Sequence, residues 1–339
     1  MKVIITGGAG FIGSNAASRH LKRGHHVVVV DDLSRPGVER NLAWLEGQGK
    51  LTFLKVDVRR ATVTQQVFQD HRDADLVLHL AGQVAVTTSV VDPRTDFDIN
   101  ALGTLNVLEG VRLAKMRAAF LYSSTNKVYG GMEDVGVVET DGRYHYRDLP
   151  HGVSEERGLD FHSPYGCSKG AADQYVRDYH RIYGLSTVVL RQSCIYGYRQ
   201  FGAEDQGWVA WFMIALQHGR PITVYGDGKQ VRDILFIDDL LDAYDAAVAR
   251  IKVSAGQIYN IGGGPTNVLS LRDLLRFLSG KRGSAVEHGD ADWRPGDQRV
   301  FVSDVRRAAR DLGWTPKTSA GQGLEKLYDW VGANRKLFE

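Results

Sequence analysis

The sequence predicts an α/β protein in which a parallel sheet carries helices on both faces and a smaller C-terminal α/β lobe follows. Two observations predict this doubly wound sheet. β-branched strands alternate with helices over about the first 190 of 339 residues, and a glycine-rich turn follows the first strand. The alternation stops near residue 192, which predicts the second lobe. We expect one domain over 1–191 with about 232–255 added, and a second over 192–231 and 256–339.

The expected elements follow from the spacing of apolar residues and from the turn residues between them. In the first part we expect strands at 2–6, 27–30, 51–56, 76–80, 118–122 and 187–190, and helices at 14–23, 60–70, 95–115 and 165–183. In the second part we expect an aromatic helix that begins at 206–212, a strand at 222–225, and a helix at 237–250 that packs back on the sheet. Short strands and helices follow at 259–261, 271–278, 304–312 and 321–331.

Charge and cysteine content argue against several classes of partner. The chain carries 42 Lys and Arg against 40 Asp and Glu, which gives no reason to expect a nucleic acid or an anionic membrane. Cys167 and Cys194 are too few for a disulfide framework and lack metal-ligand spacing. Met1 leads directly into a strand, which leaves no room for a signal peptide, and no apolar run reaches the length of a membrane span. We expect a cytoplasmic protein without a bound metal.

A nucleotide site is predicted where the first strand ends. The run from Gly7 to Gly13 has the spacing G-x-x-G-x-x-G and leads into a helix. The free N–H groups and the dipole of a helix N-terminus attract a pyrophosphate. Gly7 and Gly10 allow the tight turn and the close approach of phosphate, and Gly13 lets the helix pack on the strand.

An acidic pair at the end of the next strand indicates which dinucleotide binds. Asp31 and Asp32 follow the glycine run by roughly 20 residues, where a carboxylate hydrogen-bonds the adenosine ribose and repels a 2′-phosphate. The sequence therefore favours NAD over NADP. Arg35 partly opposes this preference, because a basic side chain there offsets the repulsion.

Later strand ends carry further groups suited to a cofactor, because the carboxyl ends of parallel strands meet at one edge of the sheet. Asp57 and Val58 suit the adenine edge, and the run Ala81-Gly82-Gln83 lets backbone approach the cofactor. Asn100, inside an expected helix, needs buried partners, so it either supports a backbone distortion or faces the cofactor.

A tyrosine and a lysine four residues apart predict the reactive centre. Tyr165 and Lys169 lie one turn apart on one face of the expected helix. A nearby ammonium favours the phenolate, so we expect Lys169 to lower the pKa of Tyr165 and make it a usable general base. Thr125 follows Ser123 and Ser124 at a strand end and adds a hydroxyl. With the nucleotide loop, these groups predict hydride transfer.

The chain resembles an extended short-chain dehydrogenase/reductase of the nucleotide-sugar epimerase branch over essentially its full length. The motifs that carry the resemblance are the glycine run, Asp31, the Thr125, Tyr165 and Lys169 trio, Arg232-Asp233, and the string 312–316. Longer strings are similar to the branch members that invert carbon 2 of CDP-hexoses; they span 82–89, 124–130, 160–175, 199–201, 205–209 and 228–233. The resemblance implies a Rossmann fold with NAD as cofactor.

The resemblance also implies roles for individual residues. Thr125, Tyr165 and Lys169 are expected to be catalytic. The residues expected at the cofactor are Gly7, Gly10, Phe11, Ile12, Gly13, Asp31, Asp32, Ser34, Arg35, Asp57, Val58, Leu80, Ala81, Gly82, Gln83, Asn100, Ser123, Tyr165, Lys169 and Gln192. Those expected at the substrate are Thr88, Thr125, Asn126, Cys194, Gln206, Trp208, Val224, Arg232, Arg294 and Asp297.

Several of these assignments have a structural alternative. Arg232 is the best candidate for the substrate pyrophosphate, since guanidinium binds phosphate in a bidentate manner. Arg294 and Asp297 are also explained by a solvated ion pair at a surface turn. Trp208, three residues before Trp211 on a helix, is as well explained by core packing as by a pocket wall.

The reaction is narrowed by two residues after Thr125. Dehydratases of this family carry Asp-Glu there, whereas this chain has Asn126 and Lys127. An amide cannot transfer a proton at neutral pH and lysine has the opposite charge to glutamate, so expulsion of water is disfavoured. The resemblance then implies an NAD-dependent isomerase that oxidises carbon 2 of a CDP-hexose to a 2-keto sugar and returns the hydride to the other face.

Two alternatives to this function stay open. One is a UDP-hexose 4-epimerase or another NAD-dependent nucleotide-sugar epimerase on the same scaffold. A more remote one is a non-catalytic NAD(H)-sensing module, although such proteins typically lack the tyrosine or the lysine. In either epimerase case, relatives pair through the helices that correspond to 95–115 and 165–183, which implies a homodimer or homotetramer in carbohydrate metabolism.

Overall fold

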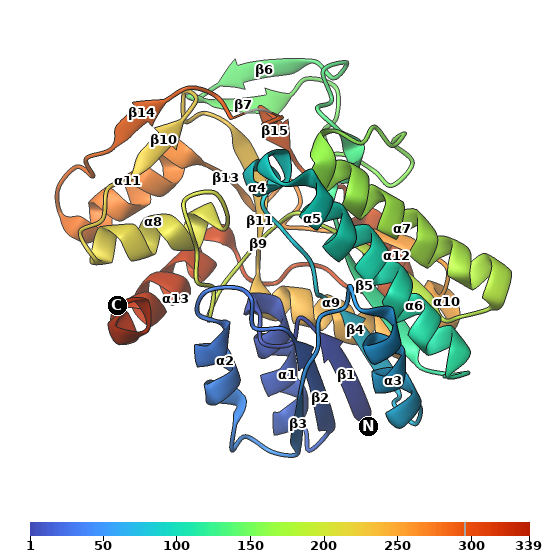
Figure 1. Ribbon diagram of the computed structural model, residues 1–339. Coiled ribbons are helices and arrows are strands. Elements are labelled where there is room, and N and C mark those ends of the chain that lie inside the picture. Colours follow the sequence, from blue (N-terminus) through green and yellow to red (C-terminus); the bar gives the residue numbers. More distant parts are fainter. Residues whose placement is uncertain (295) are drawn as a thin grey trace.

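A parallel sheet forms the centre of the computed structural model, which describes residues 1–294 and 296–339 (Figure 1). Its strands lie in the order β12-β8-β5-β4-β1-β2-β3, and every neighbouring pair is parallel. Their bounds are β1 Lys2–Thr6, β2 His26–Asp31, β3 Leu51–Lys55, β4 Leu76–His79, β5 Ala119–Thr125, β8 Thr187–Gln192 and β12 Ile258–Ile261. The strand order reverses between β1 and β4, and ligands of such sheets bind at the carboxyl ends beside that point.

Helices cover both faces of this sheet. Val3 and Ile5 of β1 pack in a core with helices α1 (Phe11–Lys22) and α9 (Ile237–Ala249), whereas Ile4 packs in a second core on the other face. That second core contains residues of α3 (Ala61–Asp70), α6 (Gly103–Leu113) and α7 (Ser163–Tyr183). Successive side chains of a strand point to opposite faces, so a strand apolar throughout serves two cores. The predicted doubly wound class is confirmed.

The second lobe contains a smaller sheet, in which β11 (Val231–Phe236) pairs with β13, β15 and β9. Its other elements are β9 Cys194–Tyr196, α8 Trp208–Gln217, β10 Thr223–Tyr225, α10 Ile251–Ser254, β13 Val268–Ser270, α11 Leu271–Arg282, β14 Gly289–Ala291, β15 Val300–Phe301, α12 Arg306–Leu312, α13 Ala320–Ala333 and the short helix Arg335–Phe338. A hairpin of β6 (Val137–Thr140) and β7 (Arg143–Tyr146) lies over this lobe (Figure 1). No helix within 1–294 or 296–339 combines the length and apolarity needed to cross a membrane.

Sheet membership differs from the expected domain boundaries at two strands. β11 was expected with the nucleotide-binding domain but lies in the smaller sheet, where Ile234 pairs with Cys194. β12 was expected in the second lobe but closes the edge of the large sheet, where Ile258 pairs with Val189. The chain crosses between the two sheets three times after residue 192, and the composition of a strand does not show which sheet it joins.

The helix expected at 95–115 is present over most of that range, but it contains a π turn. Helix α5 (Pro93–Phe97) leads into a π segment at Asp98–Leu102 before α6 begins. Asn100, in this segment, accepts a hydrogen bond from the N–H of Gln83 at 2.9 Å, and its amide donates to Asp96 and Ser168 at 3.1 Å each. The expected link between buried Asn100 and a backbone distortion is therefore confirmed.

A buried ion pair joins α7 to the large sheet. The Arg191 guanidinium donates to both carboxylate oxygens of Asp173 at 2.9 Å, and both side chains are almost fully buried. Asp173 also accepts from Ser124 at 2.7 Å, and Arg191 donates to the hydroxyl of Tyr129 at 3.1 Å. Asp173 therefore fixes α7 against β8 through Arg191, and against β5, which ends at Thr125, through Ser124.

A buried histidine predicts acid sensitivity of the fold. His79 lies between the hydroxyls of Thr6 and Thr104, at 2.6 and 2.9 Å, and burial lowers its pKa to about 3. Between pH 6.5 and 3 the unfolded chain therefore binds a proton that the folded chain excludes, so stability falls as the pH falls. The loss should be on the order of 3 kcal/mol at pH 4.

Urea melts at pH 7 and pH 4 would measure this loss. His79→Gln should flatten the difference between the two pH values, whereas a substitution of the exposed His151 should leave it as in the wild type. An unchanged pH difference in His79→Gln would assign the acid sensitivity to other groups.

Candidate active site

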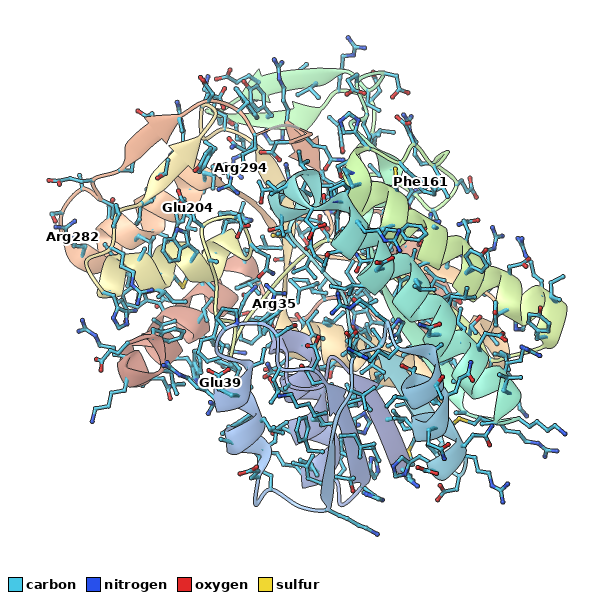
Figure 2. The ribbon with its side chains drawn as sticks, in the orientation of Figure 1. Arg35, Glu39, Phe161, Glu204, Arg282 and Arg294 are labelled. Carbon is cyan, nitrogen blue, oxygen red and sulfur yellow. The ribbon has the colours of Figure 1, made fainter. Side chains whose placement is uncertain are left out.

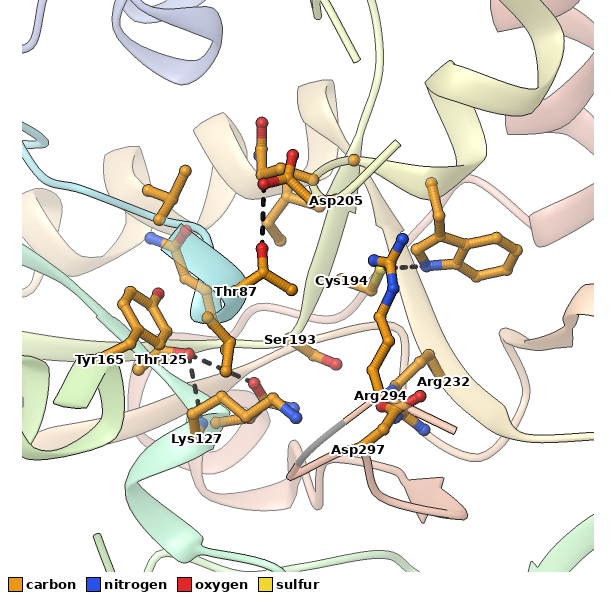
Figure 3. A pocket seen from close by; sticks show the side chains of 18 of the residues that line it. Thr87, Thr125, Lys127, Tyr165, Ser193, Cys194, Asp205, Arg232, Arg294 and Asp297 are labelled. Carbon is orange, nitrogen blue, oxygen red and sulfur yellow. Dashed lines mark hydrogen bonds and ion pairs between the residues drawn. The ribbon is translucent and has the colours of Figure 1, made fainter. Parts of the chain in front are cut away.

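A cavity of about 380 Å³ opens where the carboxyl edge of the large sheet faces the second lobe. Its walls come from the ends of β5 and β8, the N-terminal turns of α1 and α7, and strands β9, β10 and β11. Figure 3 shows Tyr165, Thr125 and Lys127 on one side of this cavity and Arg232, Arg294 and Asp297 on another. The sheet edge predicted to bind ligands is therefore where the cavity forms.

The three expected catalytic residues meet in this cavity. Tyr165 and Lys169 lie one turn apart on α7, and Thr125 ends β5. The N–H of Tyr165 donates to the hydroxyl of Ser89 at 3.1 Å, which holds the first turn of α7. The hydroxyl oxygen of Thr125 accepts from the N–H of Lys127 at 3.2 Å. These two hydrogen bonds fix the positions of Tyr165 and Thr125 in the cavity.

The expected direction of the Tyr165 pKa shift is wrong for the protein alone. Burial raises the pKa of Tyr165 to about 12, and a hydrogen bond with Thr125 only partly opposes this. Lys169 does not supply the expected lowering, because its ammonium donates to the carbonyl of Ser123 at 2.6 Å and lies over the Tyr122 ring. Burial also lowers the pKa of Lys169 to about 7. The four-residue spacing predicts that Tyr165 and Lys169 lie close together, but it does not predict how burial shifts their pKa values.

The glycine run fits the pyrophosphate of a dinucleotide. A Cβ at Gly13 would lie 2.1 Å from the carbonyl oxygen of Gly7, and one at Gly7 would lie 2.7 Å from the nitrogen of Ala81. Only glycine fits at either position. Gly10 starts α1 without a side-chain cap, and the first turn of α1 carries no acidic residue among those described. The N–H groups of this turn therefore remain available to an anion.

The acid at the end of β2 is positioned by the same loop. Asp31 accepts hydrogen bonds from the N–H groups of Ala9 at 3.0 Å and Leu33 at 2.9 Å, and burial raises its pKa. Asp32 accepts from the N–H and the hydroxyl of Ser34 at 3.0 and 2.7 Å. Arg35 donates to the side chain of Gln206 at 3.0 Å and so is engaged with the second lobe (Figure 2).

Substituting the acid at the end of β2 should change the choice of dinucleotide. Asp31→Ser removes the charge that repels a 2′-phosphate, so the affinity for NADP relative to NAD should rise roughly tenfold or more. Fluorescence titrations with both dinucleotides would measure the ratio. Asp32→Asn is the matched control and should shift the ratio less. An unchanged ratio in Asp31→Ser would show that another group excludes NADP.

The other expected cofactor residues divide into two groups. Six line the cavity directly: Phe11, Ile12, Leu80, Gly82, Ser123 and Gln192. Asp57 instead forms an ion pair with Arg59 at 2.8 Å. The Val58 side chain packs in the core so close to Gly103 that a Cβ at Gly103 would lie 2.8 Å from it. The carbonyl of Val58 is also engaged, because it accepts a hydrogen bond from the Asn106 amide at 2.9 Å.

Most expected substrate residues line the cavity, with two exceptions. Asn126, Cys194, Gln206, Trp208, Arg232, Arg294 and Asp297 are in its wall. The side chain of Val224 is buried in the core, and its neighbours Thr223 and Tyr225 line the cavity instead. Thr88 is likewise replaced in the wall by Thr87. Successive side chains of a strand point to opposite faces, so Thr223 and Tyr225 of β10 face the cavity and Val224 faces the core. This alternation could have been predicted from the sequence.

Residues 203–206 form a strap across the cavity, a feature that the sequence analysis missed. Asp205 accepts from the hydroxyls of Thr87 and Thr88 at 3.0 and 3.4 Å. The carbonyl of Glu204 accepts from Arg294 at 2.7 Å, and both residues lie in the second lobe (Figure 2). Arg294 also stacks on Tyr225 at 3.9 Å. Side-chain contacts thus hold the strap to both halves of the molecule.

On the substrate side, one ion pair and one thiol are already engaged. Arg232 pairs with Asp297, and the indole N–H of Trp208 donates to the sulfur of Cys194 at 3.0 Å. Burial raises the pKa of Cys194 to about 11, so its thiol is neutral. Trp208 is therefore part of the cavity wall. The ion-pair partner of Arg232 is Asp297, which lines the same cavity.

Comparison with known proteins places these features in a family context. The model of the NAD dependent epimerase/dehydratase family matches residues 3–262. CDP-paratose 2-epimerase of Salmonella typhi is 46% identical over 338 residues, which cover 98% of this chain and 100% of that protein. UDP-glucose 4-epimerase of Mycolicibacterium smegmatis is 34% identical, covering 97% and 98%. The solved structure of UDP-glucose 4-epimerase from Thermus thermophilus in complex with NAD has 32% identity and a TM-score of 0.82, covering 98% and 100%.

Proposed function

The chain belongs to the NAD dependent epimerase/dehydratase family, and from this premise we propose that it inverts carbon 2 of a CDP-hexose of the paratose and tyvelose type. The observation that carries the proposal is the Thr125, Tyr165 and Lys169 trio in one cavity with Arg232, in a chain 46% identical to a CDP-paratose 2-epimerase. NAD is the cofactor, and the glycine run and Asp31 are the residues that hold it.

NAD, when bound, supplies reversible oxidation of the sugar carbon and is regenerated in each turnover. Tyr165 removes the proton from the sugar hydroxyl and returns it after the keto sugar has presented its other face. Thr125 hydrogen-bonds the same oxygen. Because burial holds the pKa of Tyr165 near 12, a positive charge at the reacting centre is needed before its phenolate forms at neutral pH. Lys169, on the next turn of α7, donates to the carbonyl of Ser123 in this structure and would have to turn from it toward Tyr165 to contribute that charge.

The same cavity lacks the groups for dehydration at the two positions that follow Thr125. Asn126 accepts a hydrogen bond from the Thr125 hydroxyl at 3.3 Å, so its amide orients the threonine. Lys127 lines the wall beside it. Neither replaces the acid and base that expel water in dehydratases.

Product analysis with isotopic labelling tests the proposal. Purified protein with NAD and CDP-[2-²H]paratose should yield CDP-tyvelose that keeps its deuterium, because the hydride returns to the carbon that it left. Solvent deuterium at carbon 2 in the bulk product would overturn direct return. Parallel incubations with CDP-glucose and UDP-glucose test the 4-epimerase alternative, which requires galactose products.

Oligomerisation through α6 and α7 accompanies this function. Phe97, Tyr175, Ile182 and Tyr183, on or beside these helices, are 50–65% exposed in the single chain. Apolar residues exposed along one helix pair favour burial against a second copy. Sedimentation velocity should show a dimer or tetramer, and Tyr175→Lys with Ile182→Lys should shift it toward the monomer. A monomeric wild type would contradict this assignment.

A further inference from the structure

Lys127 is a cation in the wall of the cavity to which neither the fold nor the trio gives a role. It lies two residues after Thr125, and its backbone N–H donates to the Thr125 hydroxyl oxygen. Its ammonium donates to the carbonyl of Gly296 at 3.2 Å, and burial lowers its pKa to about 8. Over residues 1–294 and 296–339, no carboxylate forms an ion pair with it. A partly buried ammonium without an anion indicates a position prepared for one.

Lys127 and its two charged neighbours, Arg232 and Asp297, together carry a net positive charge. Asp297, which follows the Gly296 carbonyl, is already paired with Arg232. Arg294 enters the cavity from the same loop and contributes a further cation. Glu204 and Asp205 are on the strap, where they are bonded to Tyr225 and to Thr87 at 3.0 Å each. The diphosphate of a sugar nucleotide is an anion of the kind that an ammonium and guanidinium groups bind.

Accepting the proposed function, we infer that Lys127 binds the β-phosphate of the substrate and thereby sets which sugar carbon meets Tyr165. The phosphate is attached to carbon 1, carbon 2 is bonded to carbon 1, and carbon 4 lies across the ring. The Lys127 side chain lines the same cavity as Thr125 and Tyr165, so a phosphate held there keeps carbon 1 near the reacting hydroxyls and presents carbon 2 to them. Without this anchor the diphosphate rests on Arg232 and Arg294, and the sugar is free to shift along the cavity.

Nucleotide binding without turnover tests the phosphate contact. Calorimetric titration of the NAD-bound protein should show that Lys127→Met weakens CDP binding roughly 10- to 100-fold, the size of a lost charge-assisted hydrogen bond. CMP lacks the β-phosphate, so its affinity should change much less. Lys127→Arg should restore CDP binding. Lys229→Met is the matched control, because Lys229 pairs with Glu139 on the hairpin at 2.7 Å, and it should bind both nucleotides as the wild type does.

Loss of CDP and CMP affinity by equal factors, or of neither, would overturn the assignment to the β-phosphate. Thermal melts of Lys127→Met and Lys127→Arg establish that both variants are folded. These titrations need no epimerisation. Selective loss of CDP binding in a protein that epimerises nothing would retain the phosphate contact and reject the proposed function.

The choice of carbon is tested by product analysis with CDP-glucose, which has hydroxyls at carbons 2 and 4. The wild type should invert carbon 2, and Lys127→Met should lower that rate more than tenfold and raise the fraction of carbon 4 product. Lys127→Arg should restore carbon 2 selectivity. A Lys127→Met variant that loses CDP affinity yet keeps full carbon 2 selectivity would overturn the link between phosphate anchoring and carbon choice.

Discussion

Replacing Tyr165 with phenylalanine should lower kcat about 10³-fold while NAD and CDP continue to bind. General acid–base catalysis contributes 10²- to 10⁴-fold, and Tyr165 is the group in the cavity that can both take and return the hydroxyl proton. Its ring is 8% exposed and would be replaced by a ring of the same shape, so packing is preserved. The loss should therefore appear in kcat rather than in KM.

Initial rates of epimerisation at saturating substrate would measure this effect, and fluorescence titration would measure NAD binding. Tyr175→Phe provides a matched control on the same helix, since that tyrosine is 50% exposed and lies outside the cavity wall. It should retain the wild-type rate. Tyr165→Phe turning over as fast as wild type would show that another group carries the proton.

Asp173→Ala is expected to destabilise the fold by about 3–5 kcal/mol, because it leaves Arg191 buried and unpaired. Ser124 also loses its acceptor, and the Tyr129 hydroxyl becomes the remaining bonded partner of the guanidinium. The melting temperature should fall by roughly 5–10 °C. Activity should fall with stability, because Asp173 also holds α7 against the strand that carries Thr125, through the Ser124 hydroxyl. The loss of this carboxylate should also lower the pKa of Lys169 further.

Urea unfolding with a double-mutant cycle measures this contribution. Arg191→Met combined with Asp173→Ala removes the stranded charge and should recover part of the loss. Asp242→Ala, which breaks a partly exposed pair with Arg19, should cost less than about 1 kcal/mol. Equal costs for Asp173→Ala and Asp242→Ala would mean that burial does not govern the value of this pair.

The large sheet was predictable because residues that are neighbours in the sequence determine where each of its strands begins and ends. Each of its strands is a β-branched or apolar run bounded by turn residues, and the glycine run and Asp31 mark the strand ends where a nucleotide binds. Sheet membership was less predictable: β11 has six residues, as many as β2 and β8, yet it lies in the smaller sheet. The pairing of Ile258 with Val189 likewise depends on where the chain crosses rather than on composition.

The candidate site was predictable in its residues but less so in their energetics. Tyr165, Lys169 and Thr125 meet as the motif implies, yet the sign of the Tyr165 pKa shift depends on burial by elements far away in sequence. The strap at 203–206 is held by side-chain contacts with Thr87 and Arg294, which no periodicity reports. Contacts between residues so far apart in the sequence cannot be predicted from the spacing of residues along the chain.

The π turn at Asp98–Leu102 makes the length of this stretch, rather than its composition, a determinant of the site. A π turn holds more residues than an α turn, so deleting one residue there would let the helix run on regularly. The flanking α segments would keep nearly their present orientation, but the local backbone distortion that carries Asn100 would be lost. Asn100 would lose its bonds to Gln83 and Ser168 together. A family with this turn should therefore tolerate substitutions around it more readily than insertions or deletions.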